Sequence, residues 1–356
     1  MPVSQFTIYS SADLQGPGYL NGLTGSLVRI LDACLVDGYG TGSYFKSGSG
    51  WIKPFPNSSS ADGRPAFGAW TQKSGSGFTL FVNDYGISPA GGNEASVTGW
   101  EQLNQIGPVG SASVHAGVGI NQFPTPSQLL TTGRVTWRKS ALQGAVSRSW
   151  IMAADASTMY MWVKPGDAPG TQYNHFGFGD FYSLAGTNDR WRCFVYGKGS
   201  DNSTNIENNS DYCETISMGP WVSVANQLAT VQTGHYIARS AGGGGNSIPF
   251  SKKGDSTVGV LGVSGINGCS IGGSLPCPAL DNFLYMSPLY VVENSPITIR
   301  GKLRGLYQIG HPYTSFYDGQ IISGSADYTN KVFMVVGFSG INSFWAVEIS
   351  PTLDTN

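Results

Sequence analysis

Beyond its first forty residues the chain consists of short runs of hydrophobic, β-branched and aromatic residues, and Gly, Pro, Asn or Asp residues end each run. A period of two places successive side chains on opposite faces of a strand, so these runs predict β-strands. Many short strands separated by turn residues are typical of a β-sandwich or barrel. The predicted strands are Phe78–Val82, Val135–Lys139, Thr158–Val163, Arg192–Tyr196, Trp221–Ala225, Val258–Val263, Phe283–Val292, Lys331–Phe338 and Ser343–Ile349.

One segment, Leu23–Val36, has the period of a helix instead. Its apolar face comprises Leu23, Leu27, Ile30, Leu31, Cys34 and Leu35, and its polar face carries Arg29 and Asp32. Three-and-four spacing of this kind predicts an amphipathic helix packed on strands. Thr24 or Ser26 can cap its start, and Gly38 stands where a helix often ends in a left-handed residue.

The length of 356 residues suggests two domains. Two prolines and a polar cluster interrupt the strand pattern within Asn121–Gly133. We therefore expect a helix-plus-β domain over residues 1–125 and an all-β domain over residues 126–356. The predicted fold class is mainly β, with sandwich-like or barrel-like domains and one N-terminal amphipathic helix.

Charge is scarce: Asp, Glu, Lys and Arg make up 12% of the chain, and the net charge is -2. Soluble proteins average roughly 25% charged residues, so the surface is polar mainly through Ser, Thr, Asn and backbone groups. A weakly acidic chain lacks the positive surface that nucleic acids attract, and we expect no nucleic-acid partner. The 50 Gly and 19 Pro follow no collagen repeat and instead mark turns.

The start of the chain has neither a basic region nor an apolar run of the kind found in secretory signals. No stretch approaches the roughly 18 apolar residues that a membrane span needs. We expect the chain to be made in a host cytoplasm, without a membrane span, and to leave the cell only as part of a released assembly.

The sharpest enzymatic pattern is the G-x-S-x-G string at Gly268–Gly272, followed along the chain by Asp281 and His311. This order of Ser, Asp and His is that of α/β hydrolases, in which a helix starts directly after the serine. Gly273 and the nearby prolines oppose such a helix. A glycine-rich turn is therefore the favoured interpretation, with a hydrolase built on Ser270 as the alternative.

Metal ligands are not arranged in a recognisable pattern. The five cysteines are scattered without a C-x-x-C pair, and no two histidines have ligand spacing, so we expect reduced cysteines, no metal and no cofactor. Oxygen-bearing side chains occupy alternate positions from Asp201 through Asn205 and Glu207 to Asp211, but the glycine and terminal glutamate of a calcium loop are missing. A solvated loop is favoured over a calcium-stabilised one.

Scattered aspartates offer a second route to an enzyme. A pair of carboxylates across a cleft could hydrolyse a glycoside, and the candidates are Asp155, Asp167, Asp180 and Asp189. All four lie in or beside turn signals. Aspartates that accept hydrogen bonds from their own turn are the favoured interpretation.

Residues suited to contacts between subunits gather near the C-terminus. Arg300, Lys302 and Arg304 alternate and would share one face of a strand, where they favour a rim of inter-subunit ion pairs over a nucleic-acid surface. Tyr313 and Tyr317 could anchor a protein partner or stack on a sugar. The loop residues Asp201 to Asp211 are a further candidate for receptor contacts.

Three segments carry a family resemblance through their pattern and their order along the chain. The first is Tyr19–Gly40 with Gly50-Trp51, the second Trp137–Tyr160 and the third Ile299–Pro312. The matching positions are Gly22, Gly25-Ser26-Leu27, Asp32, Ala33-Cys34-Leu35, Gly50-Trp51, Trp137, Lys139-Ser140, Trp150, Asp155, Arg300-Gly301, Leu303, Gly305-Leu306-Tyr307 and His311. In this pattern the chain resembles a group of tailed-bacteriophage virion structural proteins. A closing strand region similar to Lys331–Ile349 follows.

The resemblance implies a non-enzymatic component of a phage virion, associated with the tail, baseplate or tail fibre. It carries over no catalytic residues. The chain departs from the group in its Gly-rich and Asn-rich segments at Asp201–Asp211 and Ala241–Asn246, which leaves its position in the particle open. A capsid-exterior decoration protein is the first alternative.

The partners expected on this basis are other copies of the chain, with a trimer among the arrangements that fit, and other virion proteins. Two further alternatives remain open at this stage. One is a receptor-binding or glycan-binding module that contacts the host surface, and the other is a hydrolase of cell-surface polymer.

Overall fold

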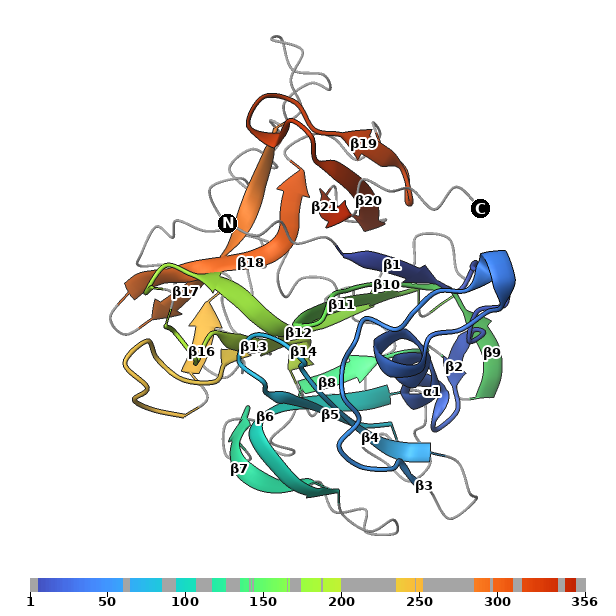
Figure 1. Cartoon of the computed structure of the whole chain (residues 1–356), viewed down its shortest axis with the longest axis horizontal. Coiled ribbons are helices and arrows are strands. Elements are labelled where there is room, and N and C mark those ends of the chain that lie inside the picture. The colour runs from blue at the N-terminus through green and yellow to red at the C-terminus, as the bar shows by residue number, and fades with distance from the viewer. Residues whose placement is uncertain are drawn as a thin grey trace.

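The computed structural model of the chain describes residues 6–59, 65–84, 94–106, 117–125, 135–140, 142, 144–164, 166, 174–186, 188–199, 235–246, 248–251, 285–294, 297–309, 316–338 and 343–349. This part of the chain is mainly β, with curled antiparallel sheets and one short helix near the N-terminus, as the sequence predicts (Figure 1).

The largest sheet has 12 strands. Neighbouring strands pair antiparallel throughout. In their order across the sheet they are β1 (Thr7–Ser10), β10 (Trp150–Ala154), β11 (Thr158–Val163), β12 (Asn174–Ser183), β13 (Cys193–Tyr196), β15 (His235–Ile237), β16 (Ile248–Ser251), β17 (Met286–Asn294), β18 (Ile297–Ile309), β21 (Ser343–Ile349), β20 (Val332–Phe338) and β19 (Ile321–Ser323).

Strand β12 changes its partner midway and thereby curls this sheet onto itself. Its first part pairs with β11 as far as Gly179, and its last part pairs with β18 from Phe181 onward. Its other edge pairs with β13. The pairings from β13 through β15, β16, β17 and β18 therefore return to β12 and complete a ring of strands.

The second sheet has 7 strands and lies below the first in Figure 1. Its strands are β14 (Lys198–Gly199), β8 (Val135–Arg138), β6 (Glu94–Ile106), β5 (Thr79–Asn83), β4 (Pro65–Thr71) and β3 (Ser58–Ser59), with β7 (Gly117–Phe123) paired to β6. A separate ribbon joins β2 (Leu20–Gly22) to β9 (Gly144–Arg148). Single 3-10 turns occur at Gly42–Tyr44 and Ala326–Tyr328.

Strands from both sides of residue 125 pair with one another. β1 pairs with β10, β2 with β9, and β6 with β8. These pairings connect the two predicted domains through backbone hydrogen bonds. The division into residues 1–125 and 126–356 stays a prediction.

The predicted helix is confirmed, although it is shorter than expected. α1 spans Ser26–Asp32 and continues as a π-helical turn over Ala33–Asp37. Neither Thr24 nor Ser26 caps it: Gly25 is the N-cap residue, with a φ of 86°, and no side chain of its own turn caps the first N–H groups. Gly38 follows the last turn with a φ of 76°, a conformation that favours glycine, as expected.

The strand predictions are confirmed where the structure describes them. Thr158–Val163 and Ser343–Ile349 match β11 and β21 residue for residue, while the other described strands shift by a few positions at their ends. Trp221–Ala225 and Val258–Val263 lie outside the described residues.

Two large apolar clusters form the core. One packs the helix residues Leu27, Ile30 and Leu31 against strands of both sheets. The other fills the space between the ring of strands and β20–β21, where Trp162 and Trp345 meet at a ring-centroid distance of 6.1 Å. The described cysteines, Cys34 and Cys193, are free and buried, as the sequence predicts. The helix is therefore a core element joining the sheets.

Leu31→Asp should abolish soluble folding, because Leu31 is fully buried in the larger cluster and an unpaired charge there costs several kcal/mol. Arg29→Asp introduces the same residue on the exposed side of the same helix and should express as the wild type does. Soluble yield and circular dichroism measure both variants. Normal folding of Leu31→Asp would contradict the packing described above.

Candidate functional site

Residues of the three segments that carry the resemblance meet through polar contacts inside the molecule. The first contact lies at the start of α1. Lys139 Nζ donates to the Leu23 carbonyl at 2.6 Å and to Ser26 Oγ at 3.1 Å, and forms an ion pair with Asp84. Asp84 Oδ2 in turn accepts from the Leu27 N–H at 2.9 Å. Asp84 thus supplies the cap that the helix lacks in its own sequence.

Both members of this ion pair are fully buried. Burial raises the pKa of Asp84, which the neighbouring ammonium group opposes, and burial lowers the pKa of Lys139, which the carboxylate opposes. Each charge therefore depends on the other, and the pair holds the second segment, through Lys139, against the first, through Leu23 and Ser26.

The second contact is centred on Asp155 in the turn between β10 and β11. Its carbonyl accepts from Trp51 Nε1 at 2.6 Å, and its carboxylate forms an ion pair with Arg304 at 2.8 Å. The same carboxylate accepts from the N–H groups of Ser157 and Thr158. Asp155 is thus a turn aspartate, as predicted, and it also links the first segment to the third.

The three basic residues predicted to share one face of a strand, Arg300, Lys302 and Arg304, lie on β18 in three different environments. Arg300 is 1% exposed and pairs with Asp189 at 2.7 Å and with Glu293 at 3.2 Å. This corrects the expectation that Arg300 lies on an exposed rim, because acidic residues of the same chain neutralise it inside the molecule. Burial raises the pKa of Glu293, and the Arg300 charge opposes that rise.

Lys302 lines an open pocket of about 570 Å³ where β12 passes from β11 to β18. We call it the Lys302 groove. Its walls are formed by Ser74, Gly75, Ser157, Asp180, Phe181, Tyr182, Ser183, Leu184, Gly186, Arg192, Lys302 and Arg304. Pockets of this size can hold a small ligand, and this one combines cations, hydroxyl groups and an aromatic ring.

Tyrosines flank Lys302 on both neighbouring strands. Tyr182 on β12 and Tyr290 on β17 are its direct cross-strand partners, so the three side chains share one face. Lys302 Nζ lies 5.9 Å from the centre of the Tyr182 ring, and the Arg304 guanidinium carbon lies 5.4 Å from it. The cross-strand register, which sequence alone does not contain, is what assembles this row.

Asp180 forms the acidic part of the groove. Sequence analysis interpreted it as a turn aspartate, and that interpretation is wrong, because Asp180 lies within β12. Its carboxylate pairs with Arg192 at 2.9 Å and accepts from Gln72 Nε2 at 3.0 Å and from the Ser76 N–H at 2.9 Å. It therefore ties the β4–β5 turn of the smaller sheet to the large sheet.

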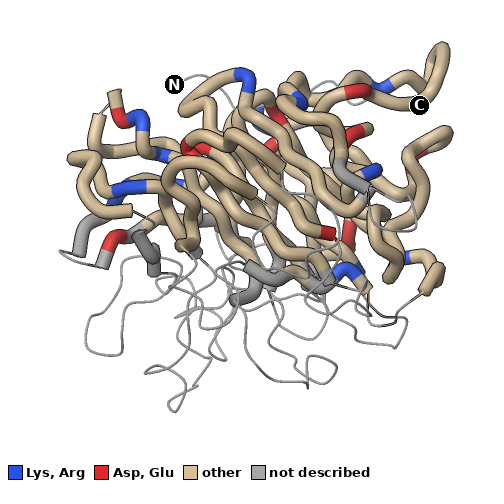
Figure 2. Tube along the Cα trace, turned by 90° about the horizontal axis from the view of Figure 1, so that it is seen from below, with Lys and Arg blue, Asp and Glu red and all other residues tan. Residues whose placement is uncertain are grey.

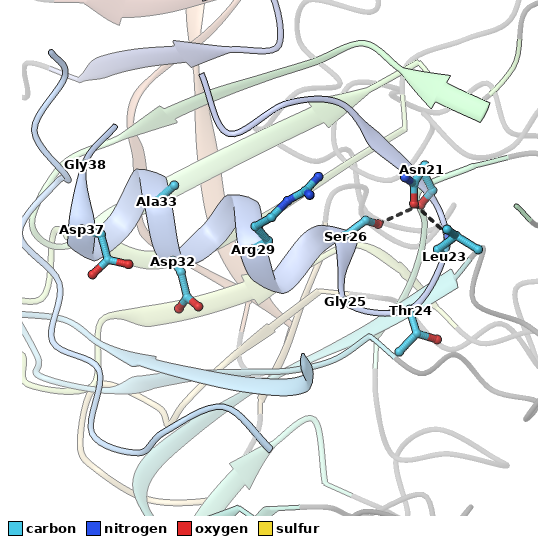
Figure 3. A pocket seen from close by; sticks show the side chains of 10 residues that line it. All are labelled: Asn21, Leu23, Thr24, Gly25, Ser26, Arg29, Asp32, Ala33, Asp37 and Gly38. Carbon is cyan, nitrogen blue, oxygen red and sulfur yellow. Dashed lines mark hydrogen bonds between the residues drawn. The ribbon is translucent and has the colours of Figure 1, made fainter. Parts of the chain in front are cut away.

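A second pocket, of about 510 Å³, runs along the outer side of α1. Figure 3 shows Asp32 and Asp37 extending from one side of the helix and Arg29 from the other. Asp32 is already engaged by Lys53 and Trp70, at 2.9 and 3.0 Å. At the other end, Ser26 Oγ donates to the Asn21 carbonyl. Because these polar groups already bond to other residues of the chain, we interpret this pocket as structural.

Most of the remaining predicted site residues lie outside the described part of the chain, and Tyr317 is the exception. Tyr317 is 69% exposed beside a turn before β19, as an anchor for a partner would be. Asp201, Asn205, Glu207, Asp211 and Tyr313 lie outside the described residues, and so do the Gly268–Gly272 string, Asp167, Asp281 and His311.

Lys and Arg positions are interspersed with Asp and Glu positions along the described part of the chain (Figure 2). Within the same residues, no three His, Cys, Asp or Glu side chains gather as a metal site would require. None of the helices described is long and apolar enough to cross a membrane. No protein-family model matches the sequence, and neither does any curated protein.

Lys139→Met should lower the free energy of unfolding by about 3–5 kcal/mol, because it leaves the Asp84 charge buried without a partner. Lys53→Met removes the partly exposed partner of Asp32 and should cost less than about 1 kcal/mol. Denaturant unfolding measures both.

Adding Asp84→Asn to Lys139→Met should recover part of the loss, since asparagine keeps an acceptor for the Leu27 N–H and removes the unpaired charge. A double variant that is as unstable as the sum of the two single variants would show that the pair is not coupled.

Proposed function

We propose that this chain is a non-enzymatic structural component of a bacteriophage virion, associated with the tail, baseplate or tail fibre, and that it acts through contacts with other copies of itself and with other virion proteins. The observation that carries the proposal is the interlocking of the three segments in which the chain resembles such proteins. Lys139 joins the first to the second, and Asp155 joins both to the third through Trp51 and Arg304.

These contacts explain why such segments would recur together in a family of scaffolds. Trp51, Trp137 and Trp150 are buried, and their partners are backbone carbonyls or core rings. Residues of this kind specify a framework, whereas residues that bind or react with a substrate are usually presented at a pocket. The resemblance therefore rests on positions that determine the fold.

Exposed apolar side chains support self-association. Leu14, Tyr19, Tyr44 and Phe45 all lie in the first fifty residues and are between 42% and 62% exposed. The segments that carry them are joined where Gln15 Oε1 accepts from the Thr41 N–H at 3.0 Å. We call these four residues the apolar corner; they lie in the segments between β1 and β2 and between α1 and β3.

A second copy of the chain is the occupant that fits the apolar corner. Asp13 and Lys46, next to Leu14 and Phe45 in the chain, neutralise each other at 2.9 Å, and the exposed Arg29 donates to the Tyr19 carbonyl at 3.4 Å. Aromatic and leucine side chains of this kind dominate permanent subunit contacts. The sparse charge of the chain as a whole agrees with a surface that is largely covered in an assembly.

A capsid-exterior position would use the same contacts and differs only in location. Receptor or glycan binding is the second candidate function, and the open Lys302 groove favours it. The hydrolase alternative depends on Ser270, which lies outside the described residues.

Phe45→Glu should weaken self-association at least about tenfold, because it places a charge within the apolar corner. Ser323→Glu adds the same charge at an exposed position of β19, outside the apolar corner, and should leave association unchanged. Sedimentation velocity over a concentration series measures both variants. A wild-type chain that stays monomeric at all concentrations, or equal behaviour of the two variants, would contradict the assigned surface.

Particles of the phage that encodes the chain should contain it in fixed stoichiometry after density-gradient purification. Quantitative mass spectrometry of the particle band measures this. Recovery of the chain only in the soluble lysate fraction would contradict a virion role.

A further inference from the structure

We propose that the Lys302 groove is a binding site for a saccharide that carries a carboxylate group. This site is separate from the apolar corner, so the inference does not depend on self-association. It assigns a ligand class to a surface that sequence analysis expected to form ion pairs between subunits.

The carboxylate would bind to Lys302. Its neighbours on the strand are engaged inside the chain, Arg300 by Asp189 and Arg304 by Asp155, at 2.7 and 2.8 Å. Lys302 has no carboxylate partner among the described residues and is only partly buried, with the Tyr182 ring beside its ammonium group. A cation held over a ring and facing a pocket can form a charge-assisted hydrogen bond with an anionic ligand.

The remaining walls suit sugar hydroxyl groups, which both donate and accept. Ser74 and Ser183 place hydroxyl groups in the groove, and the partly exposed Arg192 offers donors. Leu184 is exposed at the same wall and provides an apolar surface for the C–H groups of a sugar ring. Lys302, beside two arginines that pair with carboxylates of the chain, therefore matches one acidic sugar and its neighbours.

The acidic residues argue against a polyanion. Asp180 pairs with Arg192 and Asp155 pairs with Arg304, so two of the three cations that line the groove are balanced within the chain and Lys302 alone is left to attract an anion. A saccharide with isolated carboxylates matches this one unbalanced charge better than a polyanion does.

The groove is also held rigid. Asp180 is fixed by Gln72, Ser76 and Arg192, which anchor the turn on one wall. On the other side, β18 approaches β12 so closely that a Cβ at Gly301 would lie 2.1 Å from the Tyr182 carbonyl oxygen. A preformed site of this kind loses little conformational entropy when it binds a ligand.

The test is isothermal titration calorimetry of the full chain with sialyllactose and with lactose, which lacks the carboxylate. We expect binding of sialyllactose that weakens with added salt, and much weaker binding of lactose. Lys302→Met should reduce affinity for sialyllactose by about ten- to a hundredfold, and Lys302→Arg should retain most of it. Lys164→Met, just beyond the far end of β11, is the matched control and should bind as the wild type does.

Three outcomes would overturn the inference: no binding of sialyllactose at millimolar concentration, equal binding of both saccharides, or equal affinity of Lys302→Met and the wild type. Binding of a tetraglutamate peptide with the same affinity as sialyllactose would also overturn it, since it would show a general anion surface. Circular dichroism and thermal unfolding of each variant separate loss of binding from loss of folding.

Discussion

The buried ion pair between Asp84 and Lys139 is the interaction on which the rest of the structure depends. α1 begins without a capping side chain of its own, and its first turn is buried, so its N–H groups need an acceptor from elsewhere in the fold. Asp84 provides that acceptor from the end of β5, and Lys139 balances its charge from the end of β8. Because a buried charge without a partner is costly, the helix, the smaller sheet and the second segment can reach their native arrangement only together.

The second constraint is the change of partner along β12. A strand that pairs first with β11 and then with β18 curls the large sheet and leaves an opening where one partner replaces the other. The Lys302 groove lies at this point, and Arg304, which pairs with Asp155, forms part of its wall. The fold thus places a rigid, solvent-facing groove next to contacts that belong to the framework. Self-association through the apolar corner would leave this groove available for a ligand.

Local sequence pattern predicted part of this fold. The run of β-branched and aromatic residues at Thr158–Val163 and the three-and-four spacing around Leu27–Leu35 depend only on near neighbours, and both elements are observed, whereas strands such as β4, β6 and β12 were not predicted. Long-range pairing was not predictable. The partners of Arg300 and Asp180 come from other strands and turns, so the sequence did not reveal that Arg300 is buried or that Asp180 lies within a strand. The Lys302 groove likewise depends on cross-strand register, which a single sequence does not encode in its spacing.

The central claim, a structural role in a phage particle, is tested most directly by locating the chain. The measurement is immunogold labelling of intact and disrupted particles of the phage that encodes it, with an antibody to the purified protein. It gives the position of the chain in the particle. The account predicts gold at the tail, baseplate or fibre end, whereas gold over the capsid would make the chain a head decoration protein. Absence of gold from both intact and disrupted particles would contradict the virion role.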